Sequence, residues 1–245
     1  MTKYASLLFI CGLAFLLAII TMQLPLGHAP TIVGNGILSN SANEVGAANV
    51  VTSVVLAYRG LDTLGELAIL FTSATIVGLI LSTDKSTVPL TKSTNSQLQQ
   101  KEVNPTFIVV HALDLLYPLL LVVGFYIIFH GHLTPGGGFQ GGVIIATAFF
   151  MDVLARPNLP LAQRAGSKAR LAWIESLSGA AFILIGLFAL LNGSEFLKPL
   201  LEHGQFGNLW SAGTLPFLYL AVGLKVGAEL SSLLLNLFYN QREGA

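Results

Sequence analysis

Residues 105–130 read PTFIVVHALDLLYPLLLVVGFYIIFH, a stretch in which apolar side chains dominate and acidic or basic groups are rare. An α-helix rises about 1.5 Å per residue, so roughly 20 apolar residues cross a hydrocarbon core of about 30 Å. This stretch is therefore predicted to be a transmembrane helix.

Five further stretches of similar character lie on either side of it, at 5–24, 62–81, 140–154, 171–191 and 209–239. The composition agrees with them, because 53% of the 245 residues are hydrophobic and 10% are charged, whereas soluble domains carry about 25% charged residues. We therefore predict an all-α, polytopic membrane protein with about six transmembrane helices.

Two segments between these stretches are predicted to have other structures. Residues 43–56 are apolar but too short to cross a bilayer, which predicts a short interfacial or re-entrant helix. Residues 82–104 are rich in Ser, Thr, Gln and Lys and cannot bury enough apolar surface to become ordered. The predicted organisation is a two-helix segment at 1–84, a flexible cytoplasmic linker at 85–104 and a four-helix domain at 105–245.

The positions of the basic residues predict the orientation, because Lys and Arg in short loops favour the cytoplasmic side. With a cytoplasmic N-terminus, nine of the twelve Lys and Arg residues fall on that side. They are Lys3, Lys85, Lys92, Lys101, Arg156, Arg164, Lys168, Arg170 and Arg242. We therefore expect a multi-pass protein of the cell membrane with both termini in the cytoplasm.

The composition also excludes several classes of function. The formal net charge is zero and there is no basic tract, so no nucleic-acid partner is expected. Cys11 is the single cysteine, which excludes a disulfide framework or a Cys-based metal site within this chain. No set of nucleophile, base and orienting group is evident, so we expect no catalytic residues, no bound metal and no cofactor.

Acidic residues in the second stretch are candidates for function, because an ionisable group inside a membrane costs at least about 2.5 kcal/mol. Glu66 lies about one turn inside the predicted outer boundary, where it either handles protons or cations or serves helix packing. Asp62 lies one turn earlier and is predicted to cap the helix or pair with Arg59. Asp152 and Glu175 lie nearer the inner boundary, and we expect them to be solvated.

A second group of candidates lies in the third stretch. His111, Asp114 and Pro118 share one helical face, and Pro118 cannot donate a hydrogen bond to the carbonyl of Asp114. The resulting carboxylate, free carbonyl and imidazole suit a hard cation or a proton relay. An ordinary proline kink beside a satisfied carboxyl group explains the same pattern.

The sixth stretch carries Lys225 and Glu229 four residues apart on one helical face. They form either a structural ion pair or part of a protonation pathway. Gly223 and Gly227 lie on the opposite side of the helix, where small residues allow close packing.

The densest local signal joins the third and fourth stretches, where residues 130–142 read HGHLTPGGGFQGG. Its glycines match a G-x-G-x-x-G pattern by chance, since they follow a membrane helix and not a strand. We predict a structural turn that packs against a neighbouring subunit. The residues of this motif are Pro135, Gly136, Gly137, Gly138, Phe139, Gln140, Gly141 and Gly142.

Residues 132–142 resemble the signature of the MnhB family, which comprises the B subunits of Mrp-type multisubunit cation/proton antiporters and their counterparts in membrane-bound hydrogenases. The resemblance covers about 105–245 and implies the same four-helix layout. The front part, with NVV at 49–51 and YRGLDTLGE at 58–66, is similar to the E-type hydrogenase subunit, which also forms the C-terminal end of the antiporter A subunit. There the glutamate that matches Glu66 is implicated in ion translocation.

Three hypotheses follow for the function of the chain. The first is a subunit of a sodium/proton antiporter, contributing Glu66 and Asp114 to the path of Na⁺ and H⁺ among other membrane subunits. The second is the same module in a hydrogenase or another complex I-like redox enzyme, where the reaction occurs on separate subunits. The third is a passive scaffold, whose buried charges only organise assembly.

Overall fold

The computed structural model describes residues 2–23, 32–83, 107–156, 168–201 and 204–243, so the predicted linker at 85–104 lies outside the described residues. The chain consists of two compact units, residues 1–38 and 39–245. The first unit holds helix α1 (Thr2–Gln23) and the beginning of helix α2 (Ile32–Val45).

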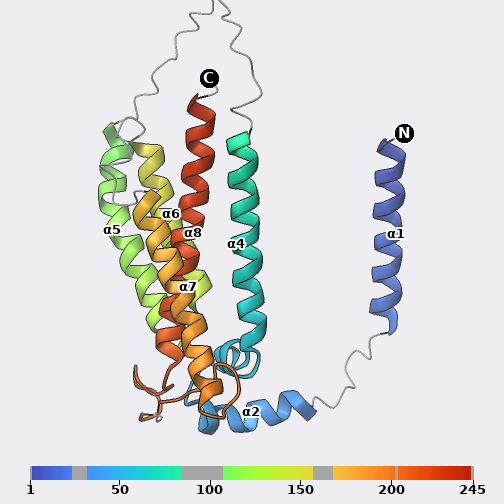
Figure 1. Cartoon of the computed structure of the whole chain (residues 1–245), viewed down its shortest axis with the longest axis vertical. Coiled ribbons are helices and arrows are strands. Elements are labelled where there is room, and N and C mark those ends of the chain that lie inside the picture. Colours follow the sequence, from blue (N-terminus) through green and yellow to red (C-terminus); the bar gives the residue numbers. More distant parts are fainter. Residues whose placement is uncertain (1, 24–31, 84–106, 157–167, 202–203, 244–245) are drawn as a thin grey trace, which may run out of the picture. The chain divides into compact units, whose positions relative to one another are not determined.

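Five long helices of the second unit run alongside one another (Figure 1). They are α4 (Gly60–Thr83), α5 (Phe107–Phe129), α6 (Gly138–Ala155), α7 (Lys168–Leu191) and α8 (Leu215–Glu243). Each is long and apolar enough to cross a membrane, and α1 contributes a shorter apolar helix at Leu7–Gln23. A helix satisfies its own backbone hydrogen bonds where no water is present. The predicted all-α, polytopic membrane fold is confirmed.

Helix α8 is the centre of the second unit. In an apolar 18-residue stretch of α8, 67% of the residues are buried, whereas in the corresponding stretch of α4 6% are buried. Helix α8 is therefore enclosed by the other helices, and α4 is largely exposed. The other four spanning helices all contact α8. Its buried side chains include Leu218, Val222 and Val226, and Phe182 of α7 lies in the same core.

Glycines of the motif bring α6 close to two neighbouring helices of the same chain. A Cβ atom added at Gly142 would lie 2.7 Å from the carbonyl oxygen of Gly223 on α8. One added at Gly141 would lie 2.6 Å from the carbonyl oxygen of Gly124 on α5. The glycines of this motif are therefore needed for close contacts within the chain, and the predicted packing against a neighbouring subunit stays a prediction.

Adding a methyl group at this contact is expected to destabilise the fold. The substitution Gly142→Ala should cost about 1–3 kcal/mol, because backbone atoms of α8 cannot yield as a flexible side chain would. The midpoint of thermal unfolding of the purified protein measures this effect. Gly65→Ala on α4 is the control, since a Cβ there meets nothing within 4 Å, and an unchanged midpoint for Gly142→Ala would contradict the packing argument.

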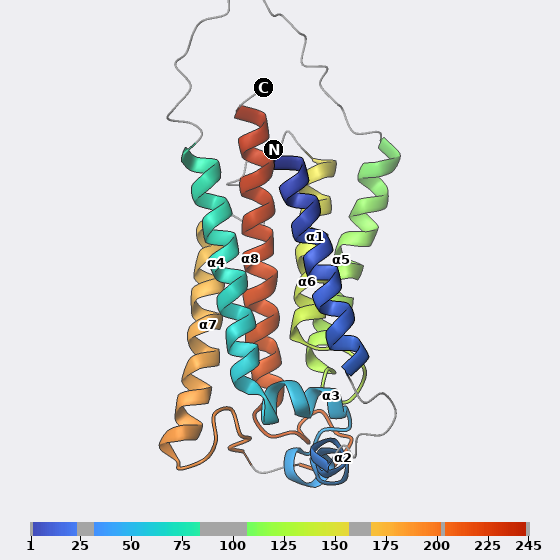
Figure 2. The ribbon, with the colours of Figure 1, turned by 90° about the vertical axis from the view of Figure 1, so that its right-hand side faces the viewer.

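The segment before α4 differs from the single helix predicted at 43–56. Helix α2 ends at Val45, and Gly46 follows with a φ of 71°, which favours glycine. Asn49 then caps the short helix α3 (Val50–Thr52), which continues into the π-helical segment η1 (Ser53–Tyr58). Figure 2 shows α3 at the end of the bundle where α4 and α8 begin.

The last helix begins at Leu215, later than the predicted start at 209. Gly213 precedes it with a φ of 55°, a left-handed conformation that interrupts a helix. Pro216 fits in the first turn, where a backbone donor is not required. The apolar character of residues 209–214 misled the prediction.

Candidate ion-path site

The glycine motif is held in place by the segment that precedes α4. The side-chain amide of Asn49 donates to the carbonyl oxygens of Gly131 at 3.0 Å and Thr134 at 3.1 Å. The hydroxyl of Thr52 donates to the carbonyl of Gly131 at 2.6 Å, and the backbone N–H of Asn49 donates to the carbonyl of His132 at 3.0 Å. These contacts join segments that the sequence places about 80 residues apart.

A cavity of about 280 Å³ lies between this segment and the motif. We call it the Glu66 cavity, because Glu66, an exposed residue, belongs to its lining. The cavity is lined by both polar and apolar residues. The other polar residues of the lining are Thr52, Thr63, Gln140 and Tyr219, the glycines 136–138 also line it, and the apolar residues are Val51, Val55, Leu56, Phe139 and Val222. The oxygen atoms of the polar residues are of the kinds that hard cations prefer as ligands.

Glu66 differs from the other acidic residues of the spanning helices in its pairing. Within the described parts of these five helices, it is the acidic residue with no basic partner. Asp62 pairs with Arg59, as predicted. Asp114 and Asp152 pair with Arg156, and Glu175 and Glu229 pair with Lys225. An unpaired carboxylate in a membrane helix is available to a mobile ion.

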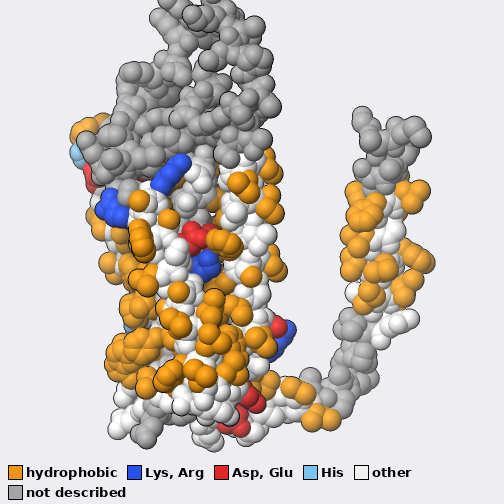
Figure 3. All heavy atoms as spheres, viewed as in Figure 1, with side chains coloured by type: hydrophobic (Ala, Val, Ile, Leu, Met, Phe, Trp, Pro, Cys, Tyr) orange, Lys and Arg blue, Asp and Glu red, His pale blue; other side chains and the backbone are white. Residues whose placement is uncertain are grey.

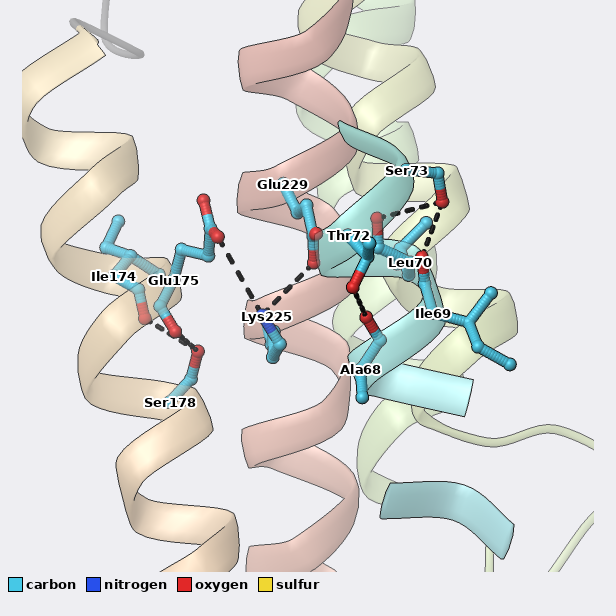
Figure 4. Close-up of polar contacts among 10 residues, drawn as sticks. All are labelled: Ala68, Ile69, Leu70, Thr72, Ser73, Ile174, Glu175, Ser178, Lys225 and Glu229. Atoms are coloured by element: carbon cyan, nitrogen blue, oxygen red, sulfur yellow. Dashed lines mark hydrogen bonds and ion pairs between the residues drawn. The ribbon is translucent and has the colours of Figure 1, made fainter. Parts of the chain in front are cut away.

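The second polar site lies inside the bundle, where Lys225 of α8 stands between two carboxylates (Figure 4). Its ammonium nitrogen is 3.2 Å from Glu229 Oε2 and 3.8 Å from Glu175 Oε1 of α7. The predicted Lys225–Glu229 pair is thus present. The expectation that Glu175 and Asp152 are solvated is wrong, because each side chain is 18% exposed and is paired with a basic residue.

A second cavity of about 270 Å³ leads to this cluster from between α4 and α7. We call it the Lys225 cavity, since Lys225 and Glu175 form its charged lining and Leu64, Leu67 and Phe71 of α4 form part of its apolar lining. Figure 3 shows acidic and basic side chains in the middle of an otherwise largely hydrophobic face. The two cavities therefore meet different faces of α4.

The candidates of the third predicted stretch have separate partners. Asp114 accepts a hydrogen bond from Arg156, which follows the end of α6 and also binds Asp152. The Nδ1 atom of His111 lies 3.0 Å from the carbonyl oxygen of Phe107, and its ring lies on the ring of Phe107. Asp114 therefore has a partner within the chain. This agrees with the interpretation in which its carboxyl group is satisfied beside an ordinary proline kink.

Comparison with known families assigns the chain. The model for a "domain related to MnhB subunit of Na⁺/H⁺ antiporter" matches residues 108–232, more than half of the sequence. The chain belongs to the MnhB family. The matched MnhB domain contains α5, α6, α7, most of α8 and the glycine motif, whereas Glu66 and Asn49 precede it.

Relatives of this MnhB protein occur in larger assemblies. A Rhizobium meliloti protein, named as the probable A/B subunit of a K⁺/H⁺ antiporter, is 25% identical over 222 residues, which are 84% of this chain and 21% of that protein. A chain of the membrane-bound sulfane sulfur reductase, an archaeal respiratory membrane complex, is 34% identical, with 97% of this chain and 99% of that chain covered and a TM-score of 0.73. A chain of the Mrp complex from Dietzia sp. DQ12-45-1b is 26% identical, with 95% and 25% covered and a TM-score of 0.70. The chain thus spans about a quarter or less of the Rhizobium protein and of the Dietzia chain.

A histidine of the turn that leads into the motif is fully buried beside the contacts of Asn49. His132 is 0% exposed, and neither ring nitrogen has a hydrogen bond of good geometry within the described residues, although carbonyls of Asn208 and Leu209 face the ring. Burial lowers the pKa of His132 from its usual 6.5, and this outweighs the opposing effect of the carbonyls. The imidazole is therefore held in its neutral form.

This burial predicts a loss of stability in acid. Because the unfolded chain binds a proton at His132 more readily than the folded chain, stability is complete above about pH 6.5 and falls as the pH drops through the lowered pKa. Unfolding midpoints of the purified protein between about pH 5 and 8 measure the slope. His132→Gln should flatten it, His111→Gln serves as the control, and an identical slope in the His132 variant would count against the prediction.

Proposed function

We propose that this MnhB protein is a membrane component of a multisubunit monovalent cation/proton antiporter, with sodium and protons as the transported ions. It acts with other membrane subunits and has no active site or cofactor of its own. Its multi-pass architecture is in keeping with this role, and both termini are proposed to lie in the cytoplasm.

The observation that carries the proposal is the unpaired carboxylate of Glu66, an exposed residue that lines a cavity of mixed polar and apolar character. An ion path needs a charge that changes partners, and a carboxylate already paired with Arg or Lys is less free to do so. The polar residues in the lining of the Glu66 cavity carry oxygen atoms of the kind that suit a partly dehydrated monovalent cation. Glu66 therefore supplies the exchangeable charge of this chain.

The comparisons support the antiporter and also a joining of two subunits. The Rhizobium protein is named as an A/B subunit, and its similarity extends over 84% of this chain, well beyond the MnhB domain. Residues 1–84 are accordingly proposed to correspond to the end of an A subunit and residues 105–245 to a B subunit.

A second candidate function is the same module in a redox-driven membrane complex. The similarity to a chain of the sulfane sulfur reductase favours it, because that match covers almost the full length of both chains. In that case, electron transfer on other subunits would drive the ion movement.

Transport by the whole purified complex in sealed vesicles tests the proposal. We expect an imposed sodium gradient to move protons in the opposite direction without any electron donor. Proton movement that depends on an electron donor would favour the redox complex. An intact complex that moves no protons in either condition would leave the chain a scaffold and contradict both functions.

A further inference from the structure

The cluster of Glu175, Lys225 and Glu229 contains two acids and one base. With all three groups ionised its net charge is −1, and its side chains are 18%, 10% and 1% exposed, respectively. An uncompensated charge in such surroundings is costly, because water and the bulk dielectric are largely excluded. The cluster therefore favours one additional positive charge.

The carboxylate of Glu229 can accept that positive charge as a proton. Both of its oxygens are buried, and neither has a hydrogen bond of good geometry within the described residues, although the ammonium of Lys225 lies 3.2 Å from Oε2. A buried acceptor without a donor costs free energy that protonation of the carboxylate would recover.

A proton suits this cluster better than a metal ion. Hard cations such as Na⁺ need several oxygen ligands, and the described lining of the Lys225 cavity adds a single further side-chain oxygen, that of Ser176. The ammonium of Lys225 already occupies the space between the carboxylates and would repel a second cation. A proton adds almost no volume and binds an oxygen atom directly.

The surroundings allow a proton to enter from one side. The Lys225 cavity reaches Lys225 and Glu175, whereas Glu229 lies behind them and is almost fully buried. From α4, the ring of Phe71 faces the ammonium at 5.1 Å.

Other charged groups lie on the neighbouring elements. Helix α7 carries Lys168 and Arg170 in its first turn, before Glu175. On α6, Asp152 is paired with Arg156, which also binds Asp114 of α5. The acids of α5 and α6 therefore have their own basic partner, which leaves Lys225 as the base between Glu175 and Glu229.

We propose that Glu175, Lys225 and Glu229 form a proton-exchange site that holds one proton between two carboxylates. When the proton is on Glu175, the ammonium of Lys225 pairs with Glu229. When the proton passes to Glu229, one O–H bond breaks as the other forms, and the ammonium moves to the ionised Glu175. This inference rests on the proposed function and gives the proton a site separate from Glu66.

Difference infrared spectroscopy of the whole purified complex tests the site without relying on transport. In a pH titration we expect a protonated-carboxyl band that is lost in Glu229→Gln and titrates at a shifted pH in Lys225→Arg. Glu195→Gln, the same change on an exposed loop, is the control. An identical band and titration in native protein, Glu229→Gln and Lys225→Arg would overturn the proposal.

Proton flux gives the second readout. At matched assembly, Glu229→Gln should lower sodium-driven proton flux by at least about tenfold, whereas a purely structural pair would leave the flux of the assembled variant unchanged. If Glu229→Gln fails to assemble, the native titration and Lys225→Arg decide the question. If the native complex shows no sodium-driven flux, the proposed function fails, and the infrared band still decides whether the cluster holds a proton.

Discussion

Replacing Lys225 by methionine is expected to leave little of the chain assembled in the membrane complex. Methionine fills a similar volume but leaves Glu229, which is 1% exposed, without its cation. Breaking a buried ion pair from one side costs about 3–5 kcal/mol, a large part of the stability of most folds. The amount of chain in the purified complex and its unfolding midpoint at neutral pH measure the loss.

Removing Glu229 as well as Lys225 should restore assembly of the chain. The double variant Lys225→Met, Glu229→Leu replaces both members of the closer ion pair by apolar groups, which is often neutral or stabilising, and leaves the more exposed Glu175 as the single charge of the cluster. It should therefore assemble better than Lys225→Met alone. Lys198→Met is the matched control, because Lys198 lies on an exposed loop. If the Lys225→Met variant were as abundant in the complex as the native chain, the stabilising role given to Lys225 would be refuted.

The second large effect is expected from Asn49→Asp. The change exchanges a donor for a carboxylate oxygen that faces the carbonyls of Gly131 and Thr134, while the oxygen that caps α3 is kept. Two hydrogen bonds worth about 1 kcal/mol each are lost and repulsion is added, so we expect a cost of about 2–3 kcal/mol. Hydrogen exchange at 49–58 and 130–137 should accelerate, and ion flux should fall as the Glu66 cavity loses its shape.

The control for this variant has the same change of side chain elsewhere. Asn43→Asp places the carboxylate on an exposed position of α2 and should leave both exchange and flux as in the native chain. Equal exchange in the Asn49 and Asn43 variants would show that Asn49 does not hold the motif in place.

The spanning helices could be predicted from sequence because the bilayer demands long apolar segments that satisfy their own backbone. The ends of these helices were harder to predict. Helix α8 is an example, because turn geometry at Gly213 and not hydropathy decides where it begins. The break between α2 and α3 has the same origin in Gly46 and the cap at Asn49.

The site could be predicted from sequence only in part, because the decisive contacts join residues that are distant in sequence. The cost of a charge in a membrane pointed to Glu66, and the spacing of Lys225 and Glu229 pointed to those two residues as a pair. Neither could reveal that Glu175, 50 positions before Lys225, completes their cluster. Helix α7 begins at Lys168 and not at 171, so Glu175 lies deeper in the helix than expected. Likewise, no local pattern joined Asn49 to the glycine motif.

The most direct test of the central claim is sodium-driven proton flux in vesicles that hold the whole purified complex, with native chain compared with Glu66→Gln at matched assembly. Asp62→Asn is the control, since Asp62 lies one turn away and is paired with Arg59. We predict that flux falls by at least about tenfold in the Glu66 variant and is retained in the control. Full flux in an assembled Glu66→Gln complex would contradict the assignment of Glu66 to the ion path.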